Sequence, residues 1–174
     1  MNTYDPYELM IIPPNKKTEM IIQEIRKSEP NLNLVSDLIV LGANLDWQDE
    51  DDWKRTALHE AVIQRNEEIV RILIDAGVNV NVQDEEKYGW TPLQMAVYYE
   101  DKKIIQLLTD AGVDVNVQDN HGWTPLHQTI FYDQVELARM LIDAGARKDI
   151  QTNDGKFPYD LAKTEEIKTI LRVV

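Results

Sequence analysis

Hydrophobic residues in the middle of the chain recur with the spacing of one helix face. Counted from Thr91, apolar side chains stand two, five and six positions further on, at Leu93, Ala96 and Val97. These positions fall on one side of a helix that turns by about 100° per residue. The same positions after Thr56 and Thr124 are filled by Leu58, Ala61, Val62, Leu126, Thr129 and Ile130. The pattern predicts a short buried helix after each threonine.

Each predicted helix belongs to a longer repeated unit. Three segments align from Thr56, Thr91 and Thr124, and in each a glycine follows the threonine after 21 residues: Gly77, Gly112 and Gly145. A threonine can cap a helix, and Pro92 and Pro125 stand at the first helical position, where a missing N–H costs nothing. A second helix, such as residues 67–75, would end at the glycine, and an extended finger would follow. Such units bury their apolar faces only when they stack.

The sequence around these units resembles the ankyrin repeat. "GWTPLH" at residues 122–127 and "AGVDVN" at residues 111–116 match the family pattern at its usual period. The resemblance implies an all-α ankyrin-repeat solenoid of paired antiparallel helices with projecting β-hairpin-like fingers. It also implies that fingers and inner helices line a concave groove for partners, and that His59 and His127 are structural residues which hydrogen-bond between repeats.

Incomplete copies flank the three complete ones. "LVSDLIVLGANLDWQD" begins at Leu34, and "FPYDLAKTEEIKTIL" begins at Phe157. We expect an N-terminal extension at 1–17 and an ankyrin-repeat domain at 18–174, divided into a capping repeat at 18–52, repeats at 53–87, 88–120 and 121–153, and a C-terminal capping repeat at 154–174. Residues 9–12 either cover the first repeat or belong to an arm that contacts a partner or a second copy.

The chain departs from the family pattern in three ways. Arg65, Glu100 and Asp133 replace the usual glycine between the two helices, and each such turn should carry about 1 kcal/mol of strain. Gln94 replaces the histidine. The first two fingers are each two residues longer than the others and carry acidic runs.

Aromatic residues occupy positions where a solenoid should meet solvent. Positions four, seven and eight after the threonine lie opposite the apolar face, and two neighbouring repeats fill the last two with Tyr98-Tyr99 and Phe131-Tyr132. All four tryptophans lie in fingers. Some rings could simply pack on the next finger, but an exposed aromatic group of this size is typical of a binding site. The predicted partner-binding residues are Trp53, Tyr88, Trp90, Met95, Tyr98, Tyr99, His121, Trp123, Phe131 and Tyr132.

The chain is acidic, with a net charge of −13. This charge argues against nucleic acid as a ligand, because phosphate binding requires Lys and Arg, and it is compatible with a basic protein partner. The carboxylates could also be ordinary solvated loops. The predicted acidic rim of the groove consists of Asp49, Glu50, Asp51, Asp52, Asp84, Glu85 and Glu86.

The sequence gives little indication of a catalytic site or a metal site. There is no cysteine, serine occurs only at Ser28 and Ser36, and the three histidines lie in different repeats without metal-ligand spacing. We therefore expect no enzyme activity, no cofactor and no metal. The sequence shows neither a secretory signal nor an apolar run of membrane-spanning length, so we expect a cytoplasmic protein without a membrane partner.

The expected function is non-catalytic binding of another protein by a chain that is monomeric when free. A narrower hypothesis is a stoichiometric inhibitor or immunity-type protein that neutralises a basic effector, since the sequence shows no second domain. Two alternatives stay open. One is a structural or assembly subunit or scaffold, and the other is an acidic mimic of nucleic acid.

Overall fold

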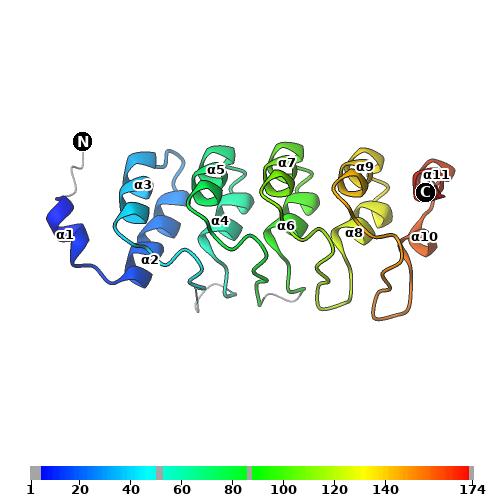
Figure 1. Cartoon of the computed structure of the whole chain (residues 1–174), viewed down its shortest axis with the longest axis horizontal. Coiled ribbons are helices and arrows are strands. Elements are labelled where there is room, and N and C mark those ends of the chain that lie inside the picture. The colour runs from blue at the N-terminus through cyan, green and yellow to red at the C-terminus, as the bar shows by residue number, and fades with distance from the viewer. Residues whose placement is uncertain (1–4, 50–52, 86–87, 173–174) are drawn as a thin grey trace.

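The computed structural model describes residues 5–49, 53–85 and 88–172, and it shows a stack of helix pairs (Figure 1). A short helix, α1 (Pro6–Met10), precedes the stack. The inner row contains α2 (Pro14–Ile25), α4 (Ala57–Ile63), α6 (Pro92–Tyr98), α8 (Pro125–Phe131) and α10 (Pro158–Leu161). The outer row contains α3 (Leu32–Val40), α5 (Glu67–Asp75), α7 (Lys102–Asp110), α9 (Val135–Asp143) and α11 (Glu165–Arg172). The all-α solenoid expected from the sequence is confirmed.

Each inner helix packs against its outer partner and against the next inner helix. Leu93, Ala96 and Val97 are fully buried, as the hydrophobic pattern predicts. Their equivalents in the neighbouring repeats are also fully buried, and all of them except the polar Thr129 belong to the same hydrophobic core, which runs from Leu9 to Leu171. Among the described residues, no repeat has a core separate from this cluster, so stability comes from contacts between neighbours.

A threonine caps each of the three central inner helices. The hydroxyls of Thr56, Thr91 and Thr124 accept a hydrogen bond from the backbone N–H three residues later, at His59, Gln94 and His127. The side chains of these three residues accept a hydrogen bond from the threonine N–H in return, each at 3.1 Å. Each of these three helices therefore begins with a capping box, in which the two residues accept hydrogen bonds from each other's backbone N–H groups.

The same histidine or glutamine also joins its repeat to the next one. Nε2 of His59 lies 3.2 Å from the carbonyl oxygen of Trp90, and Nε2 of Gln94 donates to that of Trp123 at 2.9 Å. His127 reaches Lys156 in the same way, at 3.3 Å. Gln94 thus makes both contacts that the histidines make, and the structural role expected for His59 and His127 is confirmed.

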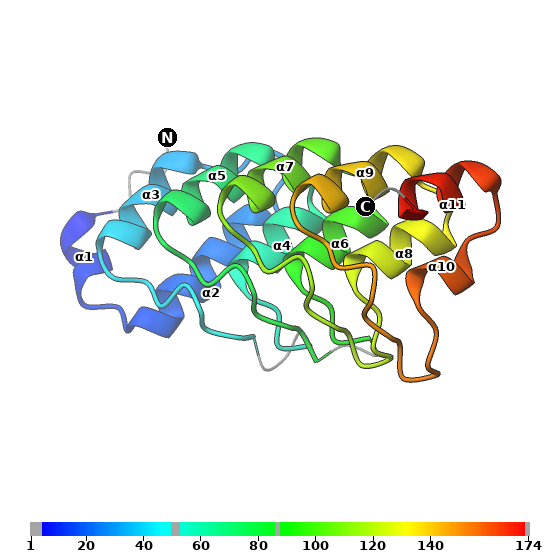
Figure 2. The same cartoon turned by 45° about the vertical axis from the view of Figure 1, so that its right-hand side comes forward.

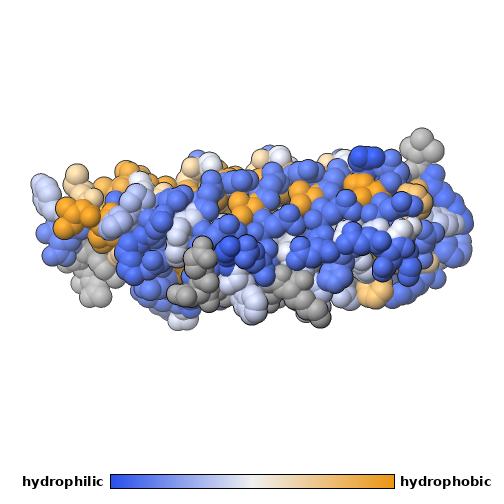
Figure 3. Space-filling view, turned by 90° about the horizontal axis from the view of Figure 1, so that it is seen from below, coloured by the Kyte–Doolittle hydropathy of each residue, from blue (hydrophilic) through white to orange (hydrophobic). Residues whose placement is uncertain are grey.

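The fingers lie side by side along one edge of the stack (Figure 2). The side-chain amides of Gln48, Gln83 and Gln118 donate to the carbonyl oxygens of Gln83, Gln118 and Gln151, so that each finger is tied to the next. Seen from the finger tips, the surface is mostly hydrophilic (Figure 3). Only one isolated β-bridge, between Asp49 and Arg55, occurs among the described residues.

The strained turns occur where the sequence places them. Arg65, Glu100 and Asp133 have φ angles of 54°, 56° and 59°, which is the left-handed region that favours glycine. Each of these residues follows an inner helix and redirects the chain to its outer partner.

The N-terminal boundary differs from the prediction. Helix α2 begins at Pro14, so the limit expected between residues 17 and 18 falls inside it. Of residues 9–12, Leu9 is buried in the shared core and Ile12 packs against it, whereas Met10 and Ile11 are exposed. This segment therefore covers the first repeat in part.

Gly122 provides the first test of this architecture. It has a φ of 77°, and a Cβ at this residue would lie 2.5 Å from the backbone nitrogen of Asn153 in the next finger. We expect Gly122→Ala to lower the free energy of unfolding by about 2–4 kcal/mol, because strain and a backbone clash add together. Gly112→Ala is the matched control, since Gly112 has the same φ with no atom near the added methyl, and it should cost about 1 kcal/mol. The free energy of unfolding is measured in urea. If both variants lost the same amount, the close approach of the two fingers at Gly122 would add nothing to the cost.

His59 provides the second test. Burial lowers the pKa of His59 from 6.5 to about 4, against a smaller opposing effect of its hydrogen bond to Trp90. Between these two pH values the unfolded chain binds a proton that the native state does not. The contribution to stability is therefore complete above pH 6.5 and is lost as pH falls toward 4, by roughly 3 kcal/mol in all.

The control for this pH effect is His59→Gln, which copies Gln94 and keeps both hydrogen bonds without a titrating group. Urea unfolding of both proteins from pH 7.5 to 4 should show a steeper loss for the wild type. If the free energy of unfolding fell equally with pH in both proteins, His59 would not be the group whose protonation destabilises the native state.

Candidate binding groove

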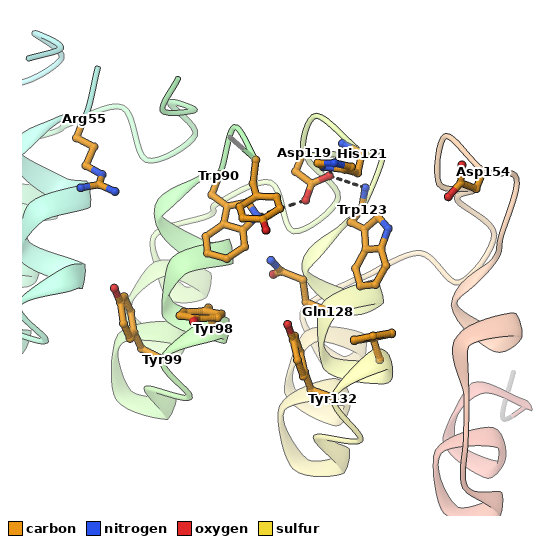
Figure 4. Close-up of a pocket in the computed structure, with 12 residues that line it drawn as sticks. Arg55, Trp90, Tyr98, Tyr99, Asp119, His121, Trp123, Gln128, Tyr132 and Asp154 are labelled. Carbon is orange, nitrogen blue, oxygen red and sulfur yellow. Dashed lines mark hydrogen bonds between the residues drawn. The ribbon is translucent and has the colours of Figure 1, made fainter. Parts of the chain in front are cut away.

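One pocket of about 670 Å³ lies in the angle between the fingers and the inner helices α6 and α8 (Figure 4). Residues of four successive repeats contribute to it, from the finger before α4 to the finger before α10. We call this pocket the groove. It is lined by Arg55, Tyr88, Trp90, Tyr98, Tyr99, Asp119, His121, Trp123, Gln128, Phe131, Tyr132 and Asp154.

The first aromatic cluster consists of Tyr88, Trp90, Tyr98 and Tyr99. The rings of Tyr88 and Trp90 are stacked with their centroids 5.0 Å apart, and Tyr98 lies 5.2 Å from Trp90 and 5.3 Å from Tyr99. Tyr98 is 51% exposed. A finger and the end of α6 therefore supply one continuous row of rings with open faces.

The second aromatic cluster consists of Trp123, Phe131 and Tyr132. Phe131 meets Trp123 and Tyr132 edge-on, with centroids 5.2 Å and 5.1 Å away. Lys163 of the next repeat lies 4.3 Å from the centre of the Phe131 ring and donates to the Phe131 carbonyl at 2.8 Å. Tyr132 is 55% exposed. The end of α8 thus repeats the arrangement at the end of α6.

Asp119 links the two clusters. One carboxylate oxygen accepts from the backbone N–H groups of His121 and Trp123, at 2.8 Å and 2.9 Å. The other accepts from the indole N–H of Trp90 at 3.3 Å. Asp119 therefore holds a tryptophan of each cluster. Sequence reasoning missed it. Asp84 holds the same place in the preceding finger and accepts from the N–H of Trp90 at 2.8 Å, but a finger sequence alone does not show either contact.

The position four residues after each threonine is buried, contrary to the prediction. Met95 is only 2% exposed and packs in the core, so it does not line the groove, and Glu60 and Gln128 are buried as well. The inner helices pack directly on one another. At positions seven and eight, Tyr98, Phe131 and Tyr132 are exposed, whereas Ile63 and Tyr99 are partly buried against the core. Gln128 nevertheless borders the groove between the two clusters (Figure 4).

Trp53 lies away from the groove. It is 58% exposed in the preceding finger, where its carbonyl accepts from the N–H of Glu85 at 2.7 Å. The groove is lined by the other eight residues predicted for partner binding: Tyr88, Trp90, Tyr98, Tyr99, His121, Trp123, Phe131 and Tyr132.

The acidic rim differs from the prediction. Asp84 is buried, hydrogen-bonds within its own finger and lies 3.9 Å from the guanidinium of Arg55, so it is a structural residue. Glu85 is paired with Lys54 at 2.7 Å, and Asp49 is half-buried in its finger. The carboxylates that do line the groove are Asp119 and Asp154. The other predicted members, Glu50, Asp51, Asp52 and Glu86, lie outside the described residues.

The groove offers flat apolar surface and hydrogen-bonding groups. Within residues 5–49, 53–85 and 88–172, no three histidine or carboxylate side chains come together as a metal site would require. Over the same described ranges, no helix has the length and apolar character to cross a bilayer. Burial also lowers the pKa of His127, which, like His59, is engaged between repeats.

Comparison with known families agrees with this architecture. The family model described as Ankyrin repeats (3 copies) matches residues 24–119, 87–154 and 101–171. The chain therefore belongs to the ankyrin-repeat family, whose members generally mediate protein–protein interactions and are typically not catalytic. A search of curated proteins returned no match to the chain.

Asp119 provides a test of how the groove is built. We expect Asp119→Ala to lower the free energy of unfolding by about 1–3 kcal/mol, because it leaves backbone N–H groups of the finger without their acceptor. It should also change the tryptophan fluorescence, since the indole of Trp90 loses its partner. Asp154→Ala removes an exposed carboxylate from the same groove and should change stability by less than about 0.5 kcal/mol. Similar effects of the two substitutions would contradict the positioning role.

Proposed function

We propose that this ankyrin-repeat protein binds a partner protein through the groove. The observation that carries the proposal is the pair of aromatic clusters, one on each of two neighbouring repeats, both open to the same pocket. Tyrosine and tryptophan bury large areas with few rotatable bonds, and they are enriched among the residues that dominate binding energy.

The rings are held in place before a partner arrives. Tyr88 stacks on Trp90, and Trp90 and Trp123 are both fixed through Asp119. A surface that is already ordered loses less entropy on binding than a flexible one. This ordering supports a binding role for groups that would otherwise be costly to expose.

Charge favours a basic partner. The net charge is −13, and Asp119 and Asp154 line the groove beside the rings. The carboxylates would speed the encounter with a basic surface and help to select it, while the rings would contribute most of the affinity. A stoichiometric inhibitor of a basic effector is the narrower form of this proposal, and it requires that one chain occupies one partner molecule.

Two of the finger carboxylates, Asp84 and Glu85, are engaged within the protein, which is evidence against mimicry of nucleic acid by those two side chains. A mimic would need a row of carboxylates free to face a DNA-binding surface. Asp84 is buried and hydrogen-bonded, and Glu85 is paired with Lys54. An assembly subunit could use the same groove, and it would differ in forming a lasting complex with several chains.

The test compares capture of partners from the source cells by three immobilised proteins. They are the wild type, the groove variant Tyr98→Ala/Tyr132→Ala, and the control variant Arg71→Ala/Arg139→Ala, whose exposed side chains lie on α5 and α9. We expect the wild type and the control to retain the same protein, and the groove variant to bind it at least about tenfold more weakly.

Folding and salt distinguish the alternatives. Each variant should first give the wild-type circular dichroism spectrum and a cooperative melt. Binding through the rings should persist when salt is raised to roughly 0.5 M, whereas a carboxylate mimic should lose its partner. Equal capture by all three proteins would move the interface away from the groove.

A further inference from the structure

The inner helices of the three central repeats end with the same pattern of hydrogen bonds. After α6, three backbone N–H groups donate to the carbonyls at positions four, five and six, and among the described residues none donates to the carbonyl of Tyr98 at position seven. The same three bonds follow α4 and α8, where position seven is Ile63 and Phe131. Carbonyls in the last turn have no partner within the helix. Position seven therefore offers one carbonyl to a donor from outside the helix.

In one repeat the chain supplies this donor itself. Lys163, which lies between α10 and α11, donates from Nζ to the carbonyl of Phe131 at 2.8 Å. The same nitrogen lies 4.3 Å from the centre of the Phe131 ring. A single residue thus binds an ammonium group with both its carbonyl and its ring, which combines a charged hydrogen bond with a cation–π contact.

Tyr98 has the same surroundings as Phe131. The residues that follow them, Tyr99 and Tyr132, have similar backbone angles, with φ and ψ of −82° and −1° against −90° and 6°. The ring of Tyr98 lies 5.2 Å from the tryptophan of its finger and 5.3 Å from the following tyrosine, against 5.2 Å and 5.1 Å for Phe131. The ring and carbonyl of Tyr98 therefore repeat those of an ammonium site that is already filled in the next repeat.

The copy at Tyr98 has no cation of its own. Within the part of the chain that the structure describes, no lysine or arginine lies over its ring. Tyr98 is 51% exposed, whereas Phe131, with Lys163 over its ring, is 37% exposed. The corresponding residue of α4 is Ile63, which has no ring. Of these three repeats, the one with Tyr98 thus presents both binding groups to the groove.

The charges around Tyr98 favour a cation. Asp119, which lines the same groove, accepts from the indole of Trp90 next to the Tyr98 ring. Arg55 also lines the groove, but its guanidinium lies 3.9 Å from the carboxylate of Asp84, which offsets its positive charge. The chain as a whole has a net charge of −13, so a positively charged side chain is attracted to this end of the groove.

We propose that Tyr98 binds a lysine side chain of the partner, whose ammonium group donates to the Tyr98 carbonyl and lies against the Tyr98 ring, as Lys163 does at Phe131. This inference rests on the proposed function, and it adds one residue of the partner and the groups that recognise it. A lysine fits better than an arginine, because one compact nitrogen reaches both ring and carbonyl, whereas a guanidinium spreads its charge over a plane.

The direct test is a nuclear magnetic resonance titration with acetyl-lysine methylamide at constant ionic strength. At up to about 50 mM it should shift the indole N–H signal of Trp90, which touches Tyr98, and leave that of Trp123 in place, since a contact of this size binds in the millimolar range. The norleucine analogue, which has no ammonium group, should cause no shift, and the arginine analogue should bind about threefold more weakly. Equal shifts with norleucine, or arginine affinity as high as that of lysine, would overturn the inference.

Lys163→Met opens the filled copy and is the most specific variant. Lys163 is exposed, so the variant should keep the wild-type circular dichroism spectrum, and Lys163→Ala would replace it if it did not. With the internal ammonium group removed, the lysine probe should shift the indole signal of Trp123 as well as that of Trp90. A Trp123 signal that still does not respond would show that a ring and carbonyl in this arrangement do not bind lysine.

Substitutions at Tyr98 test the open copy. Tyr98→Leu removes the ring and should weaken binding of the lysine probe at least about fivefold, whereas Tyr98→Phe keeps the ring and should stay within about twofold of the wild type. The control is Trp53→Leu, which removes an exposed aromatic side chain away from the groove and should change nothing. Unchanged affinity in folded Tyr98→Leu, or an equal loss in Tyr98→Phe, would refute the role of the ring.

The same variants separate this inference from the function on which it rests. In the capture experiment, a partner lost by Tyr98→Ala/Tyr132→Ala and by Tyr98→Leu, but held by Tyr98→Phe, supports both. A partner lost by the double variant but held normally by Tyr98→Leu keeps the groove and refutes the lysine contact. A partner held by both of these variants refutes the groove itself.

Discussion

The structure depends on one repeated interaction, in which a single side chain completes a helix cap and also hydrogen-bonds the next repeat. His59, Gln94 and His127 each complete the cap of their own inner helix and then bond a carbonyl of the following finger. One side chain thus fixes the start of a helix and the position of its neighbour. Because these groups are buried, a broken contact would leave polar atoms without partners on both sides. The register of the stack follows from this repeated link.

The groove is a consequence of that register. Stacking of the inner helices buries the fourth position and leaves Tyr98, Phe131 and Tyr132 at the seventh and eighth positions exposed. Tyr98 and Tyr132 then face the same side, and the fingers that carry Trp90 and Trp123 stand over them (Figure 4). Asp119 accepts hydrogen bonds from both tryptophans, so the aromatic surface is held in position by the fold itself. A binding surface ordered in this way needs little rearrangement to receive a partner.

Most buried polar groups of the scaffold are paired. The buried threonines, His59, His127 and Gln94 of the scaffold all have partners, and their hydrogen bonds recur from repeat to repeat. Two glutamines break this regularity, because Oε1 of Gln128 beside the groove and Oε1 of Gln134 before α9 have no hydrogen-bond partner among the described residues. A repeat protein makes such a difference easy to recognise, because each position can be compared with its copies in the same chain.

The sequence by itself determined the repeat, the helices and their ends. The spacing from threonine to glycine is local, and so are the capping and turn preferences, which is why the caps at Thr56, Thr91 and Thr124 and the second helix at residues 67–75 were predicted correctly. It also placed eight aromatic or histidine residues that line one groove.

Only the tertiary structure decided which of the remaining positions are buried and which polar groups are paired. A single helix does not reveal how closely its neighbour approaches, and so Met95 was expected in solvent although it lies in the core. A finger sequence does not show that Asp84 and Asp119 turn back to hold backbone N–H groups. The unsatisfied acceptor of Gln128 likewise depends on atoms from two repeats, whose distance is set by packing and not by the order of residues.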